Sequence, residues 1–327
     1  MSSGDSQVPW TDEQWALVRQ AVQKEANRSR VAATFLPLFG PLAGDADFVK
    51  SEELKYIDSP LPPSRAGAPD AVVESETMSI DEQKTIPLTT LQVRVILHGA
   101  QMADPRLTSA LEMFRRASNV LARLEDAIVF RGQQGKDKGP PDEAISGLKK
   151  IWTVRGGLDS GGLFGKPALA KRAEPVRKSD AAADAEADEK PEAVDRSGQH
   201  LVRQVSEKIG KLEGNGHFGP FAVVLGQTLF TDVQTASAAL VLPSDRIIPL
   251  LGGGPLLRSS TLPSDRGIVV ALGAAPVELV VATDVSVGFL QVTTDPLFVF
   301  RVFEKIALRI KESDAVEYLK RGGFVAK

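Results

Sequence analysis

Hydrophobic and polar positions follow a helical period most clearly in residues 104–132. Apolar residues recur there at steps of three and four and share one face, whereas charged residues occupy the opposite face. Asp104 is suited to the N-cap, Pro105 to the first helical position and Gly132 to the left-handed residue that ends the helix. At about 1.5 Å per residue the helix would be roughly 40 Å long, so the pattern predicts a spine against which other elements pack.

Three further amphipathic patterns predict shorter helices. Thr11 and Gln14, at the start of residues 11–26, have the spacing of a capping box. The apolar stripe that follows consists of Trp15, Val18, Val22 and Ala26. Residues 199–212 and 229–239 carry the other two helical patterns.

Alternating or wholly apolar runs predict the strands. Residues 297–310 form the longest run and are apolar on both faces, which predicts that both faces are buried. Residues 221–225 are apolar throughout and are expected to form a buried strand. The last residues of the chain are polar and are expected to fray. Further strands are expected at residues 86–100, 146–155, 268–272, 277–282 and 285–292.

Two segments fit neither pattern. Residues 35–42 are densely apolar, but two prolines exclude a helix, so they are expected to join the core or, as the alternative, to line a groove for an apolar peptide. Residues 45–84 are weakly patterned and too long for a loop in a compact domain. They are expected to be either disordered or an extended arm that gains structure on a neighbouring chain, with residues 71–78 as one half of a two-stranded ribbon.

Residues 156–198 change from glycine-rich to basic and then to acidic and alanine-rich. This composition predicts an exposed, largely disordered insertion, because it offers little apolar surface to bury. Gly165 and Lys166 do not form a phosphate-binding loop, since that motif needs glycine where Ser160 stands and Ser or Thr where Pro167 stands.

Composition narrows the possible functions. The 327 residues carry a net charge of −3 and no cysteine. The charge disfavours bulk binding to nucleic acid, and the lack of cysteine excludes disulfides, thiolate nucleophiles and cysteine-ligated metals. The polar start of the chain is unlike a signal peptide, and Pro276 and Glu278 interrupt the most apolar stretch, so a cytoplasmic protein without a membrane span is expected.

Candidate catalytic and metal-binding residues are few. His98, His200 and His217 show no mutual spacing typical of a metal site. Glu125 and Asp126 project about 100° apart on the predicted spine helix, so they are expected to pair with nearby Arg or Lys rather than to act as an acid–base couple. No Gly-x-Ser-x-Gly motif occurs. No catalytic residue and no metal site are therefore predicted, and the chain is not expected to be an enzyme.

Four stretches carry a resemblance to a known family. They are residues 11–15, Leu-Glu-Asp-Ala-Ile-Val-Phe-Arg-Gly at 124–132, the Gly-Pro-Phe start of 219–225, and Thr-Asp-Val-Ser-Val-Gly-Phe at 283–289. Together with the order of the predicted elements, they make the chain similar to the encapsulin shell proteins of family 1, also called linocin- or bacteriocin-like. The resemblance covers nearly the whole chain except the insertion at 156–198.

The resemblance implies an α+β fold, the HK97-like phage-capsid fold with a peripheral domain, an axial domain and an extended loop. The implied parts are an N-terminal helix and apolar segment (1–44), the extended loop (45–84), the peripheral domain (85–138 and 276–327), and the axial domain (139–275) with the insertion 156–198.

The resemblance also implies a function. Encapsulins self-assemble into closed icosahedral shells, of sixty subunits or a quasi-equivalent multiple, which form nanocompartments in the cytoplasm. The shells enclose cargo enzymes, commonly dye-decolorising peroxidases or ferritin-like iron-storage proteins, that a C-terminal targeting peptide brings inside. A homo-oligomer with a protein cargo is therefore expected, with neither nucleic acid nor membrane as a partner.

The positions that match the family's cargo-peptide site are Phe35, Leu36, Leu38, Val285, Val287 and Phe289. Ala33 and Pro37 stand where the family often has Arg and Asp, so a hydrophobic peptide is expected. The resemblance places a pore loop, which the glycines would allow to flex, at Leu251, Gly252, Gly253 and Gly254. Members that hold an external flavin use a tryptophan at a position that falls here near Ala100, so no cofactor is expected.

Two alternatives to the compartment function stay open. A phage or prophage major capsid protein would share the fold, although the N-terminal helix and the lack of a basic charge balance favour the compartment. A secreted bacteriocin or peptidase is the second alternative. The polar N-terminus and the lack of a nucleophile–base constellation weaken it.

Overall fold

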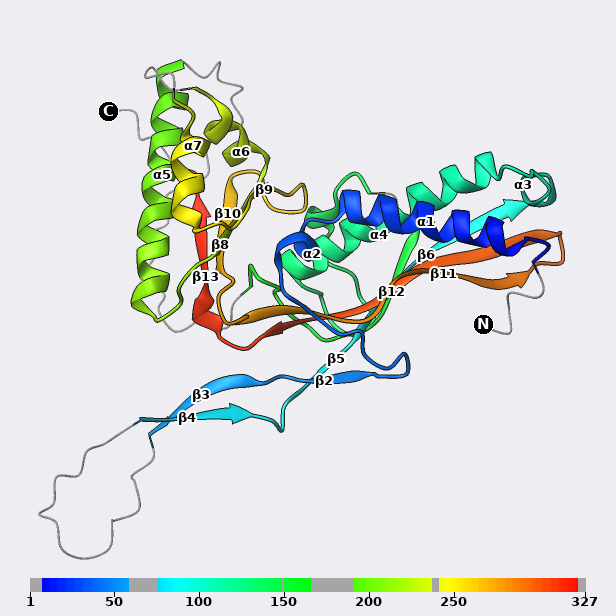
Figure 1. Cartoon of the computed structure of the whole chain (residues 1–327), viewed down its shortest axis with the longest axis horizontal. Helices are drawn as coiled ribbons and strands as arrows, with labels where there is room; N and C mark the ends of the chain where they lie inside the picture. The colour runs from blue at the N-terminus through cyan, green and yellow to red at the C-terminus, as the bar shows by residue number, and fades with distance from the viewer. Residues whose placement is uncertain (1–7, 59–75, 149, 166–190, 237–240, 323–327) are drawn as a thin grey trace, which may run out of the picture.

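The computed structural model describes residues 8–58, 76–148, 150–165, 191–236 and 241–322 (Figure 1). A five-stranded sheet covered by helices forms one end of the molecule, and a four-stranded sheet with its own helices forms the other. A narrow two-stranded arm projects away from both (Figure 1). None of the helices in these ranges is long and apolar enough to cross a membrane.

The five-stranded sheet has the order β1-β11-β12-β6-β7. β1 runs parallel to β11, and the other neighbours are antiparallel. The strands predicted within residues 86–100 and 146–155 are confirmed as β6 and β7. The strand bounds are β1 (Leu38–Phe39), β6 (Thr89–His98), β7 (Trp152–Gly156), β11 (Val277–Val292) and β12 (Leu297–Ile310).

Two predictions about the long hairpin β11–β12 need correction. The sequence predicts two strands at 277–282 and 285–292, but β11 is continuous, because register shifts between Val281 and Ser286 distort the strand without ending it. The sequence also predicts that both faces of β12 are buried. The prediction is confirmed in part: Phe300 is buried under the helices and Val299 and Ala307 are buried on the opposite face, but Phe303 on that opposite face is only half-buried.

The spine helix is confirmed as α4 (Thr108–Arg131), and it ends at Gly132, which has a φ of 76°. It begins later than predicted. Leu107 adopts a left-handed conformation with a φ of 50°, so Pro105 lies in a turn instead of the first helical position. The Asp104 carboxylate still caps the helix start, because it accepts two backbone N–H hydrogen bonds at 3.0 and 2.8 Å.

The N-terminal helix α1 (Asp12–Ser29) packs along α4 on the same face of the sheet (Figure 1). The predicted capping box is present. Thr11 Oγ1 accepts from the Gln14 N–H at 3.2 Å, and Gln14 Oε1 accepts from the Thr11 N–H at 3.0 Å. The predicted apolar stripe is buried throughout. Two short helices, α2 (Ala32–Phe35) and α3 (Gly99–Met102), also pack on α4.

Phe300 of β12 is the centre of an aromatic cluster beneath α1 and α4. Its ring centroid lies 5.0 Å from that of Trp10, 5.5 Å from that of Phe114 and 5.4 Å from that of Phe289. Trp15 of α1 lies edge-on to the same ring at 6.0 Å. Because aromatic side chains bury large areas and prefer such geometries, this cluster fixes both helices against the sheet.

The four-stranded sheet has the order β13-β10-β8-β9 and a separate hydrophobic core. Predictions for the helix at 199–212 and the strands at 221–225 and 268–272 are confirmed, although the first helix begins earlier. The helix predicted at 229–239 is shorter, and residues 237–240 lie outside the described part. The elements are α5 (Pro191–Gly214), β8 (Phe221–Leu225), α6 (Gln227–Gln234), α7 (Pro243–Ile247), the 3-10 helix η4 (Ile248–Leu251), β9 (Leu256–Arg258), β10 (Arg266–Ala271) and β13 (Val316–Lys320).

Two expectations of disorder are wrong for the residues that the structure describes. The end of the chain does not fray before residue 322, because β13 pairs with β10 and buries Val316 and Leu319. Residues 156–165 are also ordered: Leu163 is fully buried, and its carbonyl oxygen accepts a hydrogen bond from Tyr318 Oη at 2.9 Å. Residues 191–198 belong to α5. The rest of the predicted insertion, residues 166–190, lies outside the described residues.

The arm consists of two antiparallel ribbons in series. β2 (Phe48–Lys50) pairs with β5 (Thr85–Pro87), and β3 (Glu53–Asp58) pairs with β4 (Glu76–Asp81). Of the two alternatives for residues 45–84, the extended arm is therefore the one seen in the described part. The ribbon half predicted at 71–78 is β4, and residues 59–75 lie outside the description.

Candidate functional site

One face of the β3–β4 ribbon carries exposed apolar side chains. Met78 and Ile80 are 71% and 54% exposed, and Leu54 stands opposite Ile80 in the ribbon. Alternate residues of a strand share a face, so these side chains form a continuous stripe. A two-stranded ribbon is only marginally stable alone in water, and an apolar stripe of this kind is typical of a surface that another chain covers.

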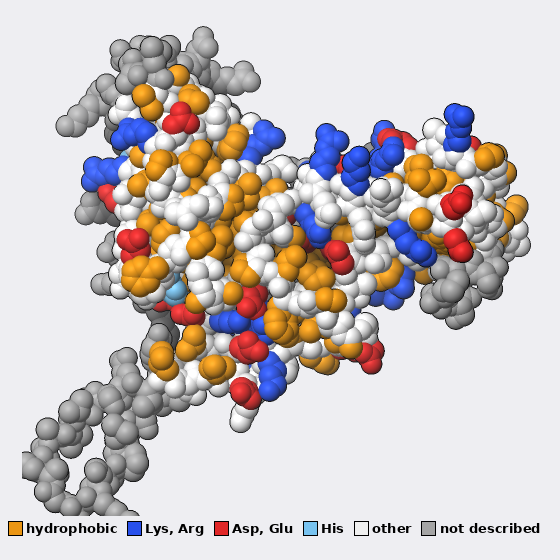
Figure 2. All heavy atoms as spheres, in the orientation of Figure 1, with side chains coloured by type: hydrophobic (Ala, Val, Ile, Leu, Met, Phe, Trp, Pro, Cys, Tyr) orange, Lys and Arg blue, Asp and Glu red, His pale blue; other side chains and the backbone are white. Residues whose placement is uncertain are grey.

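The base of the arm is fixed to β11 and β12 by buried charges. The Arg309 guanidinium is buried and donates to Glu278 at 3.0 Å from Nε, while its NH1 lies 3.2 Å from Glu52 of the arm. Burial opposes ionisation of Glu278, but hydrogen bonds from Lys311 and Arg309 hold its pKa below the usual value. Figure 2 shows such acidic and basic side chains next to one another at the base of the arm. These contacts hold the described part of the arm at its base.

The six positions matched to a cargo-peptide site do not form one open groove. The Phe35 ring is buried and stacks on Phe130, with centroids 6.3 Å apart. Leu38 is 56% exposed on the edge strand β1, where it pairs with Leu279, roughly 20 Å along β11 from Val285. The five positions that lie in or against the core beneath α1 and α4 are Phe35, Leu36, Val285, Val287 and Phe289.

The four predicted pore positions lie at the end of η4 and in the tight turn that follows it. Leu251 is buried, whereas Gly252 and Gly253 are exposed and have left-handed φ values of 60° and 94°. Gly254 allows two backbones to approach closely, because a Cβ at this position would lie 1.9 Å from the carbonyl oxygen of Phe221. The turn explains why glycine stands at positions 252 and 253, and the close backbone packing explains it at position 254. That this loop flexes stays a prediction.

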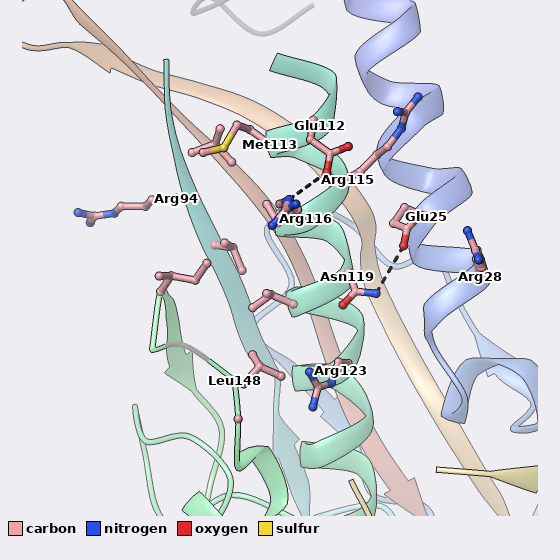
Figure 3. A pocket seen from close by; sticks show the side chains of 16 residues that line it. Glu25, Arg28, Arg94, Glu112, Met113, Arg115, Arg116, Asn119, Arg123 and Leu148 are labelled. Atoms are coloured by element: carbon pink, nitrogen blue, oxygen red, sulfur yellow. Dashed lines mark hydrogen bonds and ion pairs between the residues drawn. The ribbon is translucent and has the colours of Figure 1, made fainter. Parts of the chain in front are cut away.

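A hollow of about 700 Å³ lies between α1, α4 and the β6–β7 edge of the sheet (Figure 3). We call it the arginine groove after its lining residues Arg28, Arg94, Arg115, Arg116 and Arg123. Arg116 pairs with Glu112 at 2.9 Å, and Glu25 of α1 reaches Asn119 of α4 at 3.4 Å (Figure 3). The other four arginines form no ion pair with another described residue, and Nε of Arg123 is buried without a hydrogen-bond partner among them.

The arginine groove also has apolar walls, which include Val95, Val120 and Leu148. Several unpaired guanidinium groups near apolar side chains suit an extended acidic segment that also carries apolar residues. The sequence pattern alone does not reveal this groove. The arginines of α4 recur on one exposed face of that helix, which the sequence shows. Arg28 and Arg94 come to lie beside them only because α1 and β6 pack against α4.

Glu125 of α4 and Glu304 of β12 form a carboxyl pair buried in the sheet–helix core. No described hydrogen-bond donor reaches either carboxyl oxygen of Glu125 or Oε1 of Glu304. Burial, followed by the charge of Asp126, raises the pKa of Glu125 to about 8, and burial followed by the charge of Glu125 raises the pKa of Glu304. The raised pKa of Glu125 favours its protonated form at neutral pH, and a protonated carboxyl can donate a hydrogen bond to the other carboxyl of the pair.

Asp126 has a different role from its neighbour. Its carboxylate accepts from the backbone N–H groups of Val31 and Ala32 at 2.9 and 2.7 Å, which satisfies the start of α2. Burial raises the pKa of Asp126 to about 7, although these hydrogen bonds oppose the rise. The expectation that Glu125 and Asp126 form salt bridges is wrong, because the nearby Arg30 pairs with Asp284 at 3.1 Å instead.

Comparison with known proteins identifies the relatives of this chain. A family model described as an encapsulating protein for peroxidase matches residues 183–307. The type 1 encapsulin shell protein EncA of Myxococcus xanthus (strain DK1622) is 25% identical over 327 residues, which cover 98% of this chain and 96% of that protein. The chain is therefore similar to an encapsulin shell protein over nearly its whole length.

Solved structures confirm the predicted HK97-like capsid fold of this chain. The virus-like particle of Pyrococcus furiosus has a TM-score of 0.61 at 14% identity, over 94% of this chain and 100% of that one. The capsid of Myoviridae phage XM1 has a TM-score of 0.54 at 14% identity, over 87% and 89% of the two chains. EncA and the matching family model are described as a shell protein and an encapsulating protein, which is a structural rather than an enzymatic role.

Proposed function

We propose that this chain is an encapsulin shell protein that assembles into a closed icosahedral compartment in the cytoplasm and encloses a cargo enzyme. The likeness to EncA over nearly the whole of both chains carries this proposal. The apolar stripe of the arm supports it, since a neighbouring copy would cover that stripe. A peroxidase is the first candidate cargo, because the matching family model is described as an encapsulating protein for peroxidase. A ferritin-like iron-storage protein is the second.

Cargo would be captured through an apolar C-terminal peptide that docks beside α1. Val287 and Phe289 are half-buried beneath that helix and would form the floor of the dock, with the three buried positions supporting them from inside. Leu38 would extend the dock along β1, which lies at the edge of the described sheet. An extended peptide can add to such an edge as a further strand.

Co-expression with a fluorescent protein that ends in a short apolar peptide tests this capture. Native shells are expected to co-purify with the fluorescent protein, and Leu38→Glu is expected to lower the captured amount about tenfold, because a charge disfavours an apolar dock. Phe218→Glu changes an exposed phenylalanine beside the four-stranded sheet and serves as the control. Equal capture by both variants, in shells of native size, would rule out this docking surface.

The arginine groove would contact the arm of a neighbouring copy. The described part of the arm, residues 45–58 and 76–84, contains eight Asp and Glu but three Lys, which complements the unpaired arginines. Arg94→Glu combined with Arg115→Glu is expected to weaken assembly and to make it less sensitive to salt. Arg203→Glu, at an exposed pair on α5, is the control. Unchanged assembly in the double variant would show that the groove lies outside the contacts between copies.

The turn from Leu251 to Gly254 would line the opening at the fivefold axis of the shell. Its exposed glycines and the neighbouring exposed Ile248 support a position at a contact or an opening rather than inside the subunit. A density map of the assembled shell would test this directly. Placement of the turn away from every symmetry axis would remove it from consideration as a pore.

A capsid that packages DNA is the rival function, because the phage XM1 capsid shares the fold. The two functions differ in the contents of the particle. Nuclease-treated shells purified from cells are expected to show the ultraviolet absorbance of protein alone. Particles that protect DNA from nuclease would favour the phage function.

A further inference from the structure

Three side chains able to bind a metal ion meet at the joint between the two sheets. His217 follows α5, Glu312 follows β12, and Asp314 lies in the 3-10 helix η5 (Ser313–Ala315) that leads to β13. One donor atom from each side chain lies within 4.8 Å of the other two. These residues belong to none of the surfaces described above.

His217 is the member of the cluster that points to a ligand. Its side chain is only 6% exposed, and Nε2 lies 3.0 Å from Oδ1 of Asp314 while Nδ1 lies 3.9 Å from Oε2 of Glu312. Nε2 is nevertheless buried without a directional hydrogen bond to any described residue. A buried polar atom without a hydrogen-bond partner is unfavourable. This nitrogen faces the Asp314 carboxylate and is therefore expected to bind a ligand there.

The short distance between the two donors suits a shared ion. Imidazole nitrogen and carboxylate oxygen both bind Zn²⁺ at about 2.1 Å, so two donors 3.0 Å apart would subtend an angle of about 90° at the ion. One nitrogen with two carboxylates favours a first-row transition metal over Mg²⁺ or Ca²⁺, which prefer oxygen ligands alone. Glu312 is partly exposed and the Asp314 side chain is 54% exposed, so both can adjust and an ion can enter from solvent.

We propose that His217, Glu312 and Asp314 bind one divalent transition-metal ion per subunit, with water completing the coordination. The ion would join the loop after α5 to the connection through which the chain passes from the five-stranded to the four-stranded sheet. Binding therefore stabilises one arrangement of the two sheets, because a ligand that binds only the folded state favours that state. The inference does not depend on whether the shell holds cargo.

Zinc alone is the probe, and the sample is full-length, untagged, assembled protein freed of metal with a chelator. Equilibrium dialysis followed by elemental analysis is expected to give about one zinc ion per subunit. His217→Gln and Asp314→Asn are each expected to weaken binding at least about tenfold, because each removes a ligand. His200→Gln, which changes an exposed histidine of α5, is the matched control and should bind like the native protein.

A second measurement separates binding from folding. Zinc is expected to raise the melting temperature of the native protein by several degrees and to leave that of Asp314→Asn unchanged. Asp314 is exposed, so this variant decides the question even if the buried His217→Gln fails to fold. The proposal is overturned if the native protein binds no zinc, or if stoichiometric binding survives Asp314→Asn without loss of affinity.

Discussion

At the scale of single residues, the least expected feature is the protonated carboxyl pair of Glu125 and Glu304. Asp126 on α4, Arg30 after α1 and Asp284 on β11 are the charged groups nearest to it. Burial of two acids costs far less when both are protonated and neutral, because no charge is then taken out of water. The two carboxyl groups are therefore compatible with a packed core at pH values at which they stay protonated.

This pair predicts that the subunit becomes less stable as the pH rises. The folded pKa of Glu125 is raised to about 8 from an ordinary value of 4.5, so the unfolded chain loses its proton first as the pH increases. Stability is therefore complete below about pH 4.5 and is lost progressively up to about pH 8, by an amount on the order of a few kcal/mol. Melting temperatures across this range provide the measurement.

Two substitutions isolate the contribution of the pair. Glu125→Gln cannot ionise and is expected to flatten the dependence of the melting temperature on pH. Glu112→Gln, on the exposed face of the same helix, is the control and should keep the native slope. A native slope in Glu125→Gln would show that other groups cause the pH dependence.

The sequence could not reveal the pairings of these residues. Glu125 meets a carboxyl group about 180 positions away, and His217 meets two carboxylates that follow a strand of the other sheet. Spacing along the chain contains no information about such contacts. It therefore predicted salt bridges for the first site and no metal site for the second.

At the scale of elements, the helices were predicted best because their signals are local. The capping box at Thr11 and the left-handed end at Gly132 each depend on residues within one turn. The strands were predicted less well. β11 was divided in two because its register shifts resemble a strand end, and β13 was missed because a five-residue strand is defined mainly by its pairing with β10.

The aromatic cluster under α1 and α4 gives a prediction for β12. Phe300→Ala is expected to destabilise the subunit by about 3–5 kcal/mol, because it leaves a cavity among Trp10, Phe114 and Phe289. Denaturant unfolding of dissociated subunits, followed by tryptophan fluorescence, measures the loss. Phe218→Ala removes an exposed ring and should change stability by less than about 1 kcal/mol. Similar values for both variants would contradict the central position of Phe300.

At the scale of the whole molecule, the resemblance carried by four sequence stretches and the order of the elements predicts the capsid fold, even where single boundaries are wrong. The expected domain limits stay a prediction. Two strands pair with a sheet outside the domain in which those limits place them. β7 pairs with β6 in the five-stranded sheet although it falls within 139–275, and β13 pairs with β10 although it falls within 276–327. The resemblance matches cargo positions along the sequence but does not say which of their side chains are exposed. The cargo site is therefore the part of the prediction that the sequence supports least.

The exposed stripe of the arm predicts a defect confined to assembly. Met78→Glu combined with Ile80→Glu is expected to leave the subunit folded but to prevent shells from forming, since both side chains are largely exposed within the subunit. Ser79→Glu places a charge on the other face of the same strand and should assemble normally. Size-exclusion chromatography and circular dichroism compare the variants. Normal shells from the double variant would exclude the stripe from the contacts between copies.

The most direct test of assembly is electron microscopy of the purified, untagged protein expressed without any cargo. Closed, hollow particles of uniform diameter are expected, because the arm and its apolar stripe are completed only by neighbouring copies. Sedimentation of the protein as a compact monomer at every concentration and salt level would contradict the account.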